Sequence, residues 1–238
     1  MALPVLETWA KTLETTATGA FTATKPSGVA TNDLLVIVAG WDFSSSSTTP
    51  KFVDDLTGWN FMGTEGNTTS DSYIGAYWRI ATGSEGATEE VNVFDAGFGW
   101  TYYLRFSGVD TTTPINQSNF SVQGGNSTSH AILGVTTDVD DCLPLYFLSF
   151  HGGDGDPFSP SSGWSEIDEG EITSSVGSHC FGDKDSGQPT AGATGTVTVT
   201  STASDGSAFV QFAVAPAAAG GGNEPLFYHH QRMLIRCS

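Results

Sequence analysis

The feature that most constrains the fold is a short apolar run within Asn32–Trp41, NDLLVIVAGW. From Leu34 to Ala39 no polar residue interrupts the run, and Asn-Asp and Gly bracket it. A run of this length is too short for a helix that must be stable by itself, and its β-branched residues favour a strand. The pattern therefore predicts a strand that is buried on both faces.

The second half of the chain repeats this pattern in Asp140–Phe150, DDCLPLYFLSF. The repetition extends further, because Gly58-Trp59 returns as Gly163-Trp164 after a shift of 105 residues. Similarity at a nearly constant interval is the sequence signature of an internal duplication. We therefore expect two similar units.

The ends of these units are also similar, since Tyr102–Phe106 in the first half matches Phe209–Ala213 in the second. From these matches we predict pseudo-repeats over about residues 31–114 and 139–215. Either repeat alone would bury only a thin core, because small domains bury little of their surface. We therefore favour one β-sandwich over residues 1–215 rather than two tandem domains.

Composition agrees with an all-β fold. The chain has 238 residues, of which 29 are glycines and only 14% are charged. Loop-rich chains with Ser- and Thr-coated strands have this composition. No stretch of useful length combines a helical period with helix caps. We predict an antiparallel β-sandwich of jelly-roll type with internal duplication.

Further strands are expected on both sides of the first apolar run. Val5–Ala10 is consistent with an edge strand, and Thr16–Thr24 with another strand. Glu89–Phe94 and Trp100–Ser107 are expected to form a hairpin across the glycine-containing segment between them. In contrast, Asn116–Ser129 is polar and contains glycine, so we expect an excursion or a linker there.

The net charge of the chain is strongly negative, because 26 acidic residues against 8 Lys and Arg give a formal charge of −18. Such a surface repels nucleic-acid phosphates and anionic lipid, so we expect neither nucleic acid nor membrane as a partner. No apolar run approaches membrane-spanning length, and Met1–Leu13 lacks the basic start and apolar core of a signal peptide. We expect a protein that is made and folded in the cytoplasm.

The search for catalytic and metal-binding motifs is mainly negative. No nucleophile elbow, zinc-protease helix, phosphate-binding loop or dinucleotide fingerprint is present. The three cysteines are too widely spaced for a metal-binding pattern. Acidic pairs on Gly-rich loops, which offer oxygen ligands for calcium, occur at Asp154 with Asp156 and at Asp183 with Asp185. Loop aspartates, however, are far more often turn formers.

Two histidines offer metal or nucleophile pairs, His151 near Asp154 and His179 beside Cys180. A single histidine at a strand end is usually only solvated or hydrogen-bonded, so neither pair is given a role. We expect no enzyme activity, no metal and no cofactor. A hydrolase of envelope polysaccharide remains an alternative, because a fold can bring together carboxylates that are distant in sequence.

Exposed aromatic rings would favour sugar binding instead. Most tryptophans are in phase with apolar neighbours, which indicates the core. Trp41, beside Asp42 at a strand end, is the best candidate for exposure. Trp41 and Asp154 are therefore the candidate contacts of a glycan-binding module, an alternative function for this chain.

The chain ends in a segment of different character. Residues 216–222 are rich in Ala and Gly and predict a flexible linker. Residues 223–238 carry two arginines and one glutamate and predict a C-terminal docking arm. Its candidate interface residues, apolar or basic in type, are Leu226, Phe227, Tyr228, His229, His230, Arg232, Met233, Leu234, Ile235 and Arg236. The alternative is that the segment folds back on its own sandwich as a last strand.

Several segments together resemble a β-sandwich domain that recurs in virion proteins of tailed bacteriophages and in some bacterial surface proteins. They are Lys25–Val36 (KPSGVATNDLLV), Gly58-Trp59, Tyr77–Gly86 (YWRIATGSEG), Tyr103–Asp110 (YLRFSGVD) and Pro114. The similarity covers about residues 15–115 well and 130–215 loosely. These motifs are structural, so the resemblance implies no catalytic residues.

The resemblance implies a structural protein of the virion, made in the host cytoplasm, and most specifically a capsid decoration (cement) protein. Its expected partners are the major capsid protein or other virion proteins, and a homo-oligomer is expected. A tail, fibre or adaptor component is the alternative position within the particle.

Overall fold

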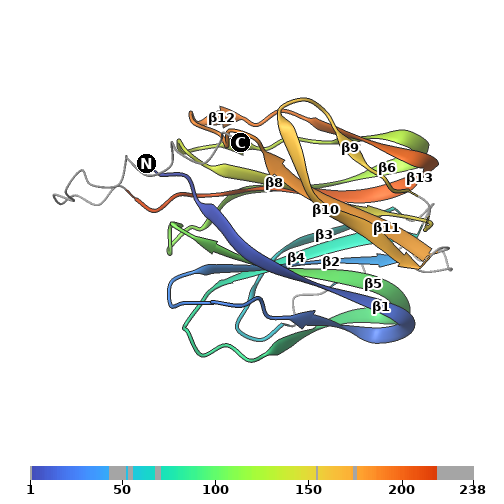
Figure 1. The fold of residues 1–238 in the computed structure, drawn as a ribbon, viewed down its shortest axis with the longest axis horizontal. Coiled ribbons are helices and arrows are strands. Elements are labelled where there is room, and N and C mark those ends of the chain that lie inside the picture. The colour runs from blue at the N-terminus through green and yellow to red at the C-terminus, as the bar shows by residue number, and fades with distance from the viewer. Residues whose placement is uncertain are drawn as a thin grey trace, which may run out of the picture.

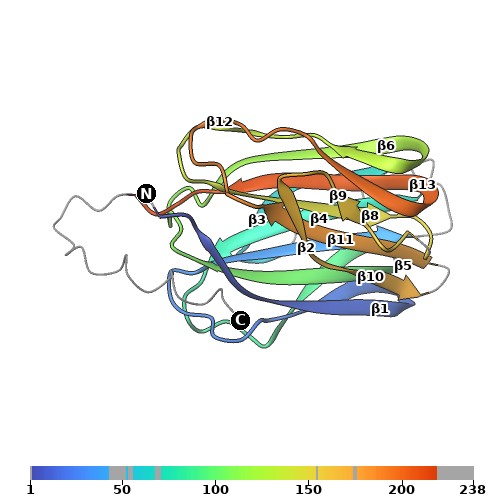
Figure 2. The same ribbon diagram turned by 45° about the horizontal axis from the view of Figure 1, so that its top comes forward.

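The structure is a computed structural model, and it describes residues 2–42, 52, 56–67, 71–153, 155–173 and 176–218. Within these ranges all regular secondary structure is β-strand, and the strands form two antiparallel layers. Figures 1 and 2 show the layers stacked on each other, one coloured blue to green and the other yellow-green to red. The predicted all-β antiparallel sandwich is therefore confirmed.

The first layer is a five-stranded sheet in the order β1-β5-β2-β4-β3, and the second follows the order β10-β11-β8-β13-β6. The strands of the first sheet are β1 (Val5–Thr24), β2 (Leu34–Asp42), β3 (Asn60–Asn67), β4 (Ser72–Ile80) and β5 (Thr88–Ser107). The strands of the second are β6 (Ile115–Ile132), β8 (Leu143–Phe150), β10 (Trp164–Thr173), β11 (Val176–Lys184) and β13 (Val197–Val214). The short strands are β7 (Thr136–Thr137), which pairs with β12 (Gly192–Ala193), and β9 (Ser159–Pro160), which pairs with β13.

The internal duplication is visible in this topology. Read from its other end, the second sheet has the order β6-β13-β8-β11-β10, which matches the first sheet strand for strand. Local backbone geometry repeats as well: Gly58 and Gly163 both have a positive φ, at 79° and 89°. Each repeat thus forms one complete sheet. A jelly roll is built from Greek keys spread over two sheets, whereas here the first sheet is complete before the second begins.

The repeats begin earlier than the sequence suggested. The predicted linker Asn116–Ser129 is wrong, because these residues lie in β6 and pair with β13. β6 is an end strand of its sheet with much of its length at the surface, so it needs few apolar residues. The predicted match of the closing strands is also shifted by one residue. Leu34 pairs with Phe106 and Leu143 with Val214, so Phe106 corresponds to Val214.

The central strands are buried at every position, as predicted for the first apolar run. One face of each sheet meets the other sheet in a shared core that includes Val36, Leu104, Phe147 and Phe212. The β1–β5 ladder bends at register shifts near Glu14 and Thr18. The part of the ladder that follows Thr18 in β1 covers the outer face of the first sheet. The β6–β13 ladder covers the second sheet in the same way.

The predicted hairpin between Glu89–Phe94 and Trp100–Ser107 is wrong, because both segments belong to the single strand β5. The glycines between them allow close packing instead of a turn. A Cβ atom at Gly97 would lie 1.7 Å from Nε1 of Trp41, and one at Gly99 would lie 2.2 Å from the ring of Phe21. The bent ladder can therefore lie directly on the aromatic rings below it.

The two repeats face each other with approximate two-fold symmetry. β1 of the first sheet contacts β10 of the second, and the equivalent pair, β6 and β3, is in contact at the other side. This is the arrangement of a two-fold dimer whose subunits are joined in one chain. The shared core makes the duplication one sandwich.

The sandwich ends two residues later than predicted. Pro216 forms a bridge with Val109, and the backbone N–H of Ala217 donates to the carbonyl of Gly108 at 2.8 Å. The first residues of the predicted linker are thus held on the first repeat. Residues 223–238, the predicted docking arm, lie outside the described residues.

Candidate functional site

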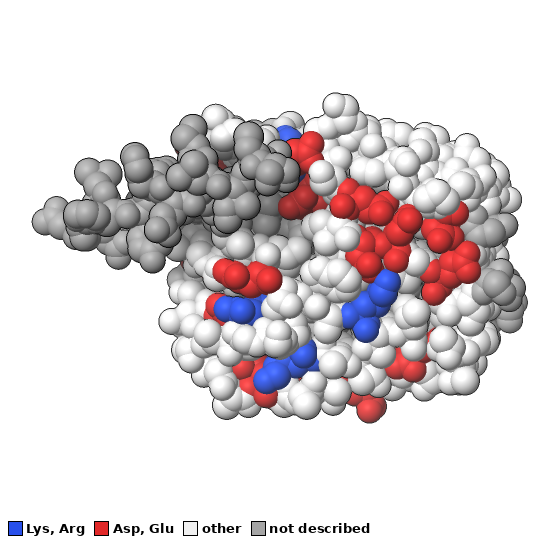
Figure 3. All heavy atoms as spheres, viewed as in Figure 1, with Lys and Arg blue, Asp and Glu red and all other residues white. Residues whose placement is uncertain are grey.

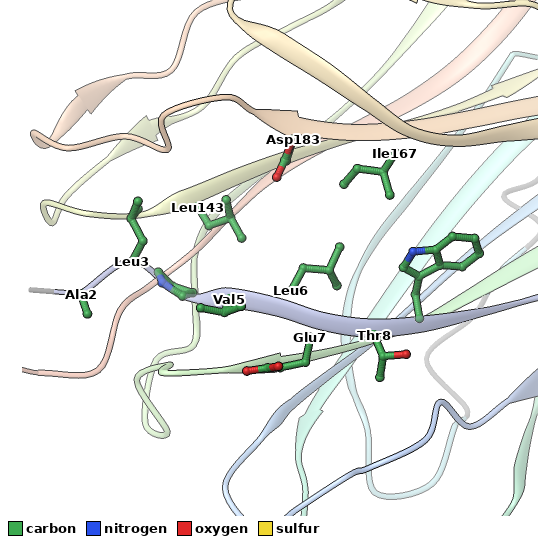
Figure 4. A pocket seen from close by; sticks show the side chains of 11 residues that line it. Ala2, Leu3, Val5, Leu6, Glu7, Thr8, Leu143, Ile167 and Asp183 are labelled. Atoms are coloured by element: carbon green, nitrogen blue, oxygen red, sulfur yellow. The ribbon is translucent and has the colours of Figure 1, made fainter. Parts of the chain in front are cut away.

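A groove of about 940 Å³ lies between the start of β1 and the second sheet. Its lining is mainly apolar and consists of Ala2, Leu3, Pro4, Val5, Leu6, Glu7, Thr8, Trp9, Leu143, Ile167 and Asp183. Figure 4 shows Leu6 pointing from β1 toward Leu143, Ile167 and Asp183, whereas Glu7 and Thr8 point to the opposite side of the strand. Leu3 and Val5 are 38% and 37% exposed.

The topology explains why a groove forms here. β1 and β10 are end strands of their sheets, so each presents one edge that no described strand pairs. Beyond Trp9 the gap between them is bridged by Lys11, whose Nζ donates to Oδ2 of Asp168 at 2.6 Å. The same Nζ donates to the backbone carbonyl of Glu169 at 3.1 Å. The groove is therefore an open seam of the sandwich that a cross-sheet ion pair closes at one end.

The groove is bordered by acidic side chains. Of its two ionisable lining residues, Asp183 lies on the groove side of β1, whereas Glu7 points to the opposite side, where it accepts a hydrogen bond from the hydroxyl of Ser107 (Figure 4). Burial, and next the carboxylate of Asp185, raise the pKa of Asp183 above its ordinary value. Figure 3 shows Asp and Glu side chains gathered on the same face, over β10 and β11. A basic or apolar partner fits this surface better than an anionic one.

A second cluster joins the ends of β2, β8 and β11. Asp42 is 4% exposed, and its Oδ1 lies 2.9 Å from Nδ1 of His151. Its Oδ2 accepts a hydrogen bond from the backbone N–H of Gly177 at 2.7 Å. The hydrogen bond to Asp42 raises the pKa of His151 above its ordinary value, against the opposing effect of burial. His151 is thus tied to Asp42, whereas the sequence paired it with Asp154, which lies outside the described residues.

A third cluster lies inside the sandwich around Tyr102. The hydroxyl of Tyr102 donates to Oδ2 of Asp168 at 2.6 Å, and its ring contacts the buried imidazole of His179. Burial, and next the charge of Lys11, lower the pKa of His179 to about 3. Cys180 belongs to the core on the opposite face of β11. His179 and Cys180 therefore do not form the pair that the sequence offered.

Trp41 is not available to a glycan. It was the best candidate for exposure among the tryptophans, but its side chain is completely buried, with its ring centroid 5.0 Å from that of Tyr73. The end of the strand is covered because the β1–β5 ladder bends over it and places Gly97 against the indole. The expectation that the other tryptophans are core residues holds for Trp59, Trp100 and Trp164.

Of the two acidic loop pairs, Asp183 and Asp185 act in local structure, and Asp154 of the other pair lies outside the described residues. Asp185 accepts a hydrogen bond from the hydroxyl of Ser165 at 2.6 Å, and Asp183 lies on β11. Across the residues that the structure describes, no group of three potential metal-ligating side chains is found. In that same part of the chain no helix is long and apolar enough to cross a membrane.

The groove was not foreseen from the sequence. It lies between residues 2–9 and three positions that are more than a hundred residues away in the chain, Leu143, Ile167 and Asp183. The available signal was the edge-strand character of Val5–Ala10, with apolar residues just before it. Searches of protein-family models, of curated proteins and of solved structures found no match to this chain.

Proposed function

We propose that this chain is a structural protein of a tailed-bacteriophage particle, and specifically a decoration protein on the outer surface of the capsid. The resemblance of about residues 15–115 to a sandwich domain of such particles supports the virion setting. The protein would stabilise the shell through buried interfaces with the major capsid protein and among its own copies, repeated many times over the particle.

The observation that carries the structural role is how the polar interior is used. Polar and ionisable side chains that could take part in catalysis are instead hydrogen-bonded between the two sheets. Asp168 of the second sheet accepts hydrogen bonds from Lys11 and Tyr102 of the first. Asp42 at the end of the first sheet binds His151 and Gly177 in the second. These groups serve to hold a rigid sandwich together, as a scaffold protein requires.

The surface charge supports the same proposal. With a formal charge of −18, the protein repels nucleic acid and other copies of itself at long range. Such a protein stays soluble at high concentration until specific contacts with the shell hold it. Phosphate-rich partners are disfavoured, which suits the outside of a particle whose DNA lies inside.

The test uses particles from which the protein is absent. Deletion of its coding sequence should give particles that lose integrity at a lower temperature. Addition of purified full-length protein should restore the temperature at which the original particles lose integrity. Particles from the intact genome are the control. Unchanged heat resistance together with impaired attachment to host cells would favour the tail, fibre or adaptor position.

A further inference from the structure

The groove beside β1 combines apolar surface with a strand edge that no described strand pairs. Its floor is formed by side chains of the core or packed against it, such as Leu143 and Ile167, while Leu3 presents apolar surface at its mouth. Burial of such apolar surface is favourable at roughly 25 cal/mol per Å². An extended peptide can add to an unpaired strand edge, and β1 offers one along the groove. The groove therefore suits an extended, partly apolar peptide.

The described chain ends close to the mouth of this groove. Ala217 is hydrogen-bonded to Gly108. A Cβ atom at Gly108 would lie 3.8 Å from the carbonyl oxygen of Leu3 and 4.0 Å from Cα of Pro4, both of which line the groove. Only residues 219–222, AGGG, separate Ala218 from the last sixteen residues. Four residues span about 14 Å at most, which is enough for the chain to turn back to Leu3.

The last segment also has the matching chemistry. Residues 223–238, NEPLFYHHQRMLIRCS, combine six large apolar residues with two arginines and two histidines. The carboxyl group of Asp183 borders the groove, and acidic side chains cover the neighbouring β10–β11 face. Opposite charges at the rim and apolar contacts at the floor are the usual arrangement of a specific interface.

We propose that the groove beside β1 is the binding site of the chain's own C-terminal segment, residues 223–238. This choice favours the second of the two sequence-based alternatives, a segment that folds back on its own sandwich. A short flexible tether gives an effective concentration on the order of millimolar, so a segment of the same chain outcompetes a neighbour's in dilute solution. The inference does not rest on the proposed virion function.

The test uses the full-length chain with a nitroxide spin label on Cys237. The other two cysteines, Cys142 and Cys180, are buried, so the label is directed to the segment. Backbone amide signals of Leu3, of residues 5–9, and of Leu143 and Ile167 should lose most of their intensity, and reduction of the nitroxide should restore them. Signals of β3 and β4 should change little.

Two matched variants separate docking from general effects. Leu3→Lys places a charge at the mouth of the groove (Figure 4), whereas Val122→Lys places it on β6, in the other repeat. Leu3 and Val122 are 38% and 39% exposed, so both variants should fold. Leu3→Lys should restore the groove signals without reduction of the label, and Val122→Lys should leave the signal loss unchanged. Equal behaviour of the two variants would overturn the proposal.

A mixed sample distinguishes the segment of the same chain from that of a neighbour. Spin-labelled chains without ¹⁵N are mixed with ¹⁵N-labelled chains that carry no spin label. The proposal predicts full signal intensity in the mixture. Signal loss at the groove in the mixture would show that a second copy supplies the segment, and intact groove signals in the directly labelled chain would show that the segment does not dock there. Either result overturns the proposal.

Discussion

At the scale of single residues, the fold depends on glycines that let aromatic rings lie against the backbone. Gly97 of β5 covers the indole of Trp41, and Gly40 of β2 lies beside Trp100, where a Cβ atom would come within 2.1 Å of the ring. Both indoles are completely buried. Because packed interiors do not yield easily, even one added methyl group at such a position forces a ring or a strand to move.

Gly97→Ala should therefore lower the free energy of unfolding by about 2–3 kcal/mol. Urea unfolding followed by tryptophan fluorescence measures this change. Gly124→Ala on β6 is the control, because a Cβ atom there meets nothing within 4 Å. Equal stabilities of the two variants would contradict the packing of the β1–β5 ladder on Trp41.

The buried imidazole of His179 should make the protein sensitive to acid. The pKa of His179 is lowered to about 3 from an ordinary value of 6.5, so the unfolded chain binds a proton that the folded chain excludes. Stability then falls as the pH drops below about 6.5, by on the order of 2 kcal/mol at pH 4.5 from this residue.

His179→Leu removes the titrating group while keeping a similar volume. The free energy of unfolding, measured at pH 7 and pH 4.5, should fall less in the variant than in the unmodified protein. His130, whose pKa burial lowers to about 4, is present in both proteins and cancels in the comparison. An identical loss of stability in both proteins would show that His179 is not excluded from protonation.

At the scale of elements, the ties between the sheets are the decisive contacts. Asp42 at the end of β2 reaches His151 after β8, and Ser72 of β4 donates to the carbonyl of Ser149 in β8 at 2.7 Å. At the seam, Lys11 of β1 meets Asp168 of β10. These directional contacts determine the position of one sheet relative to the other. Apolar packing alone determines this position less precisely, because it is not directional.

The hydrogen bond between Asp42 and His151 should contribute to the free energy of unfolding with a pH dependence opposite to that of His179. Because the pKa of His151 is raised in the folded protein, its contribution is complete below about pH 6.5 and is lost as the pH rises through the folded value. The side chain of His151 is 35% exposed, so solvent screening limits the effect to about 0.5 kcal/mol.

The stability difference between the unmodified protein and His151→Gln should therefore be larger at pH 6 than at pH 8.5. Chemical unfolding at the two pH values measures it, and Asp42→Asn should abolish the pH dependence of the difference. A stability difference between the two proteins that grows with pH would contradict the hydrogen bond between His151 and Asp42.

The elements also show what the sequence can and cannot predict. The strands β2 and β8 were predictable because burial on both faces demands an unbroken apolar run. The edge strand β6 was not, because it is polar over most of its length and is fixed by pairing with β13. The glycines of β5 suggested a turn, since a sequence does not distinguish a glycine that turns from one that packs against Trp41.

The candidate site was still less accessible to sequence reasoning. The groove exists because the repeats face each other and bring β1 against β10, residues that are far apart in the chain. Trp41 was misjudged for a related reason, since its burial depends on the bend of a ladder that no local pattern encodes. Long-range pairing therefore determines the site, while local pattern determines the central strands.

At the scale of the whole molecule, the sandwich is two fused copies of one sheet. The shared core contains side chains from both repeats, so each sheet alone would expose an entire apolar face. Exposed apolar faces of that size drive association or prevent folding. We therefore expect the duplicated chain to unfold as a single cooperative unit rather than as two tandem domains.

The repeats expressed separately, as residues 1–109 and 110–238, should each lack a cooperative unfolding transition, whereas the full chain should unfold in one step. Coexpressed halves should associate, because their inner faces are complementary. Calorimetry of each half and of the mixture tests this expectation. Independent cooperative unfolding of either half would contradict the shared core.

The most direct test of the central proposal is the copy number of the protein in purified particles from the genome that encodes it. Quantitative mass spectrometry against the major capsid protein gives this number. A decoration protein should be present at a fixed ratio that matches the symmetry of the shell. Absence of the protein from the particles would contradict the proposed function, whatever the stability measurements show.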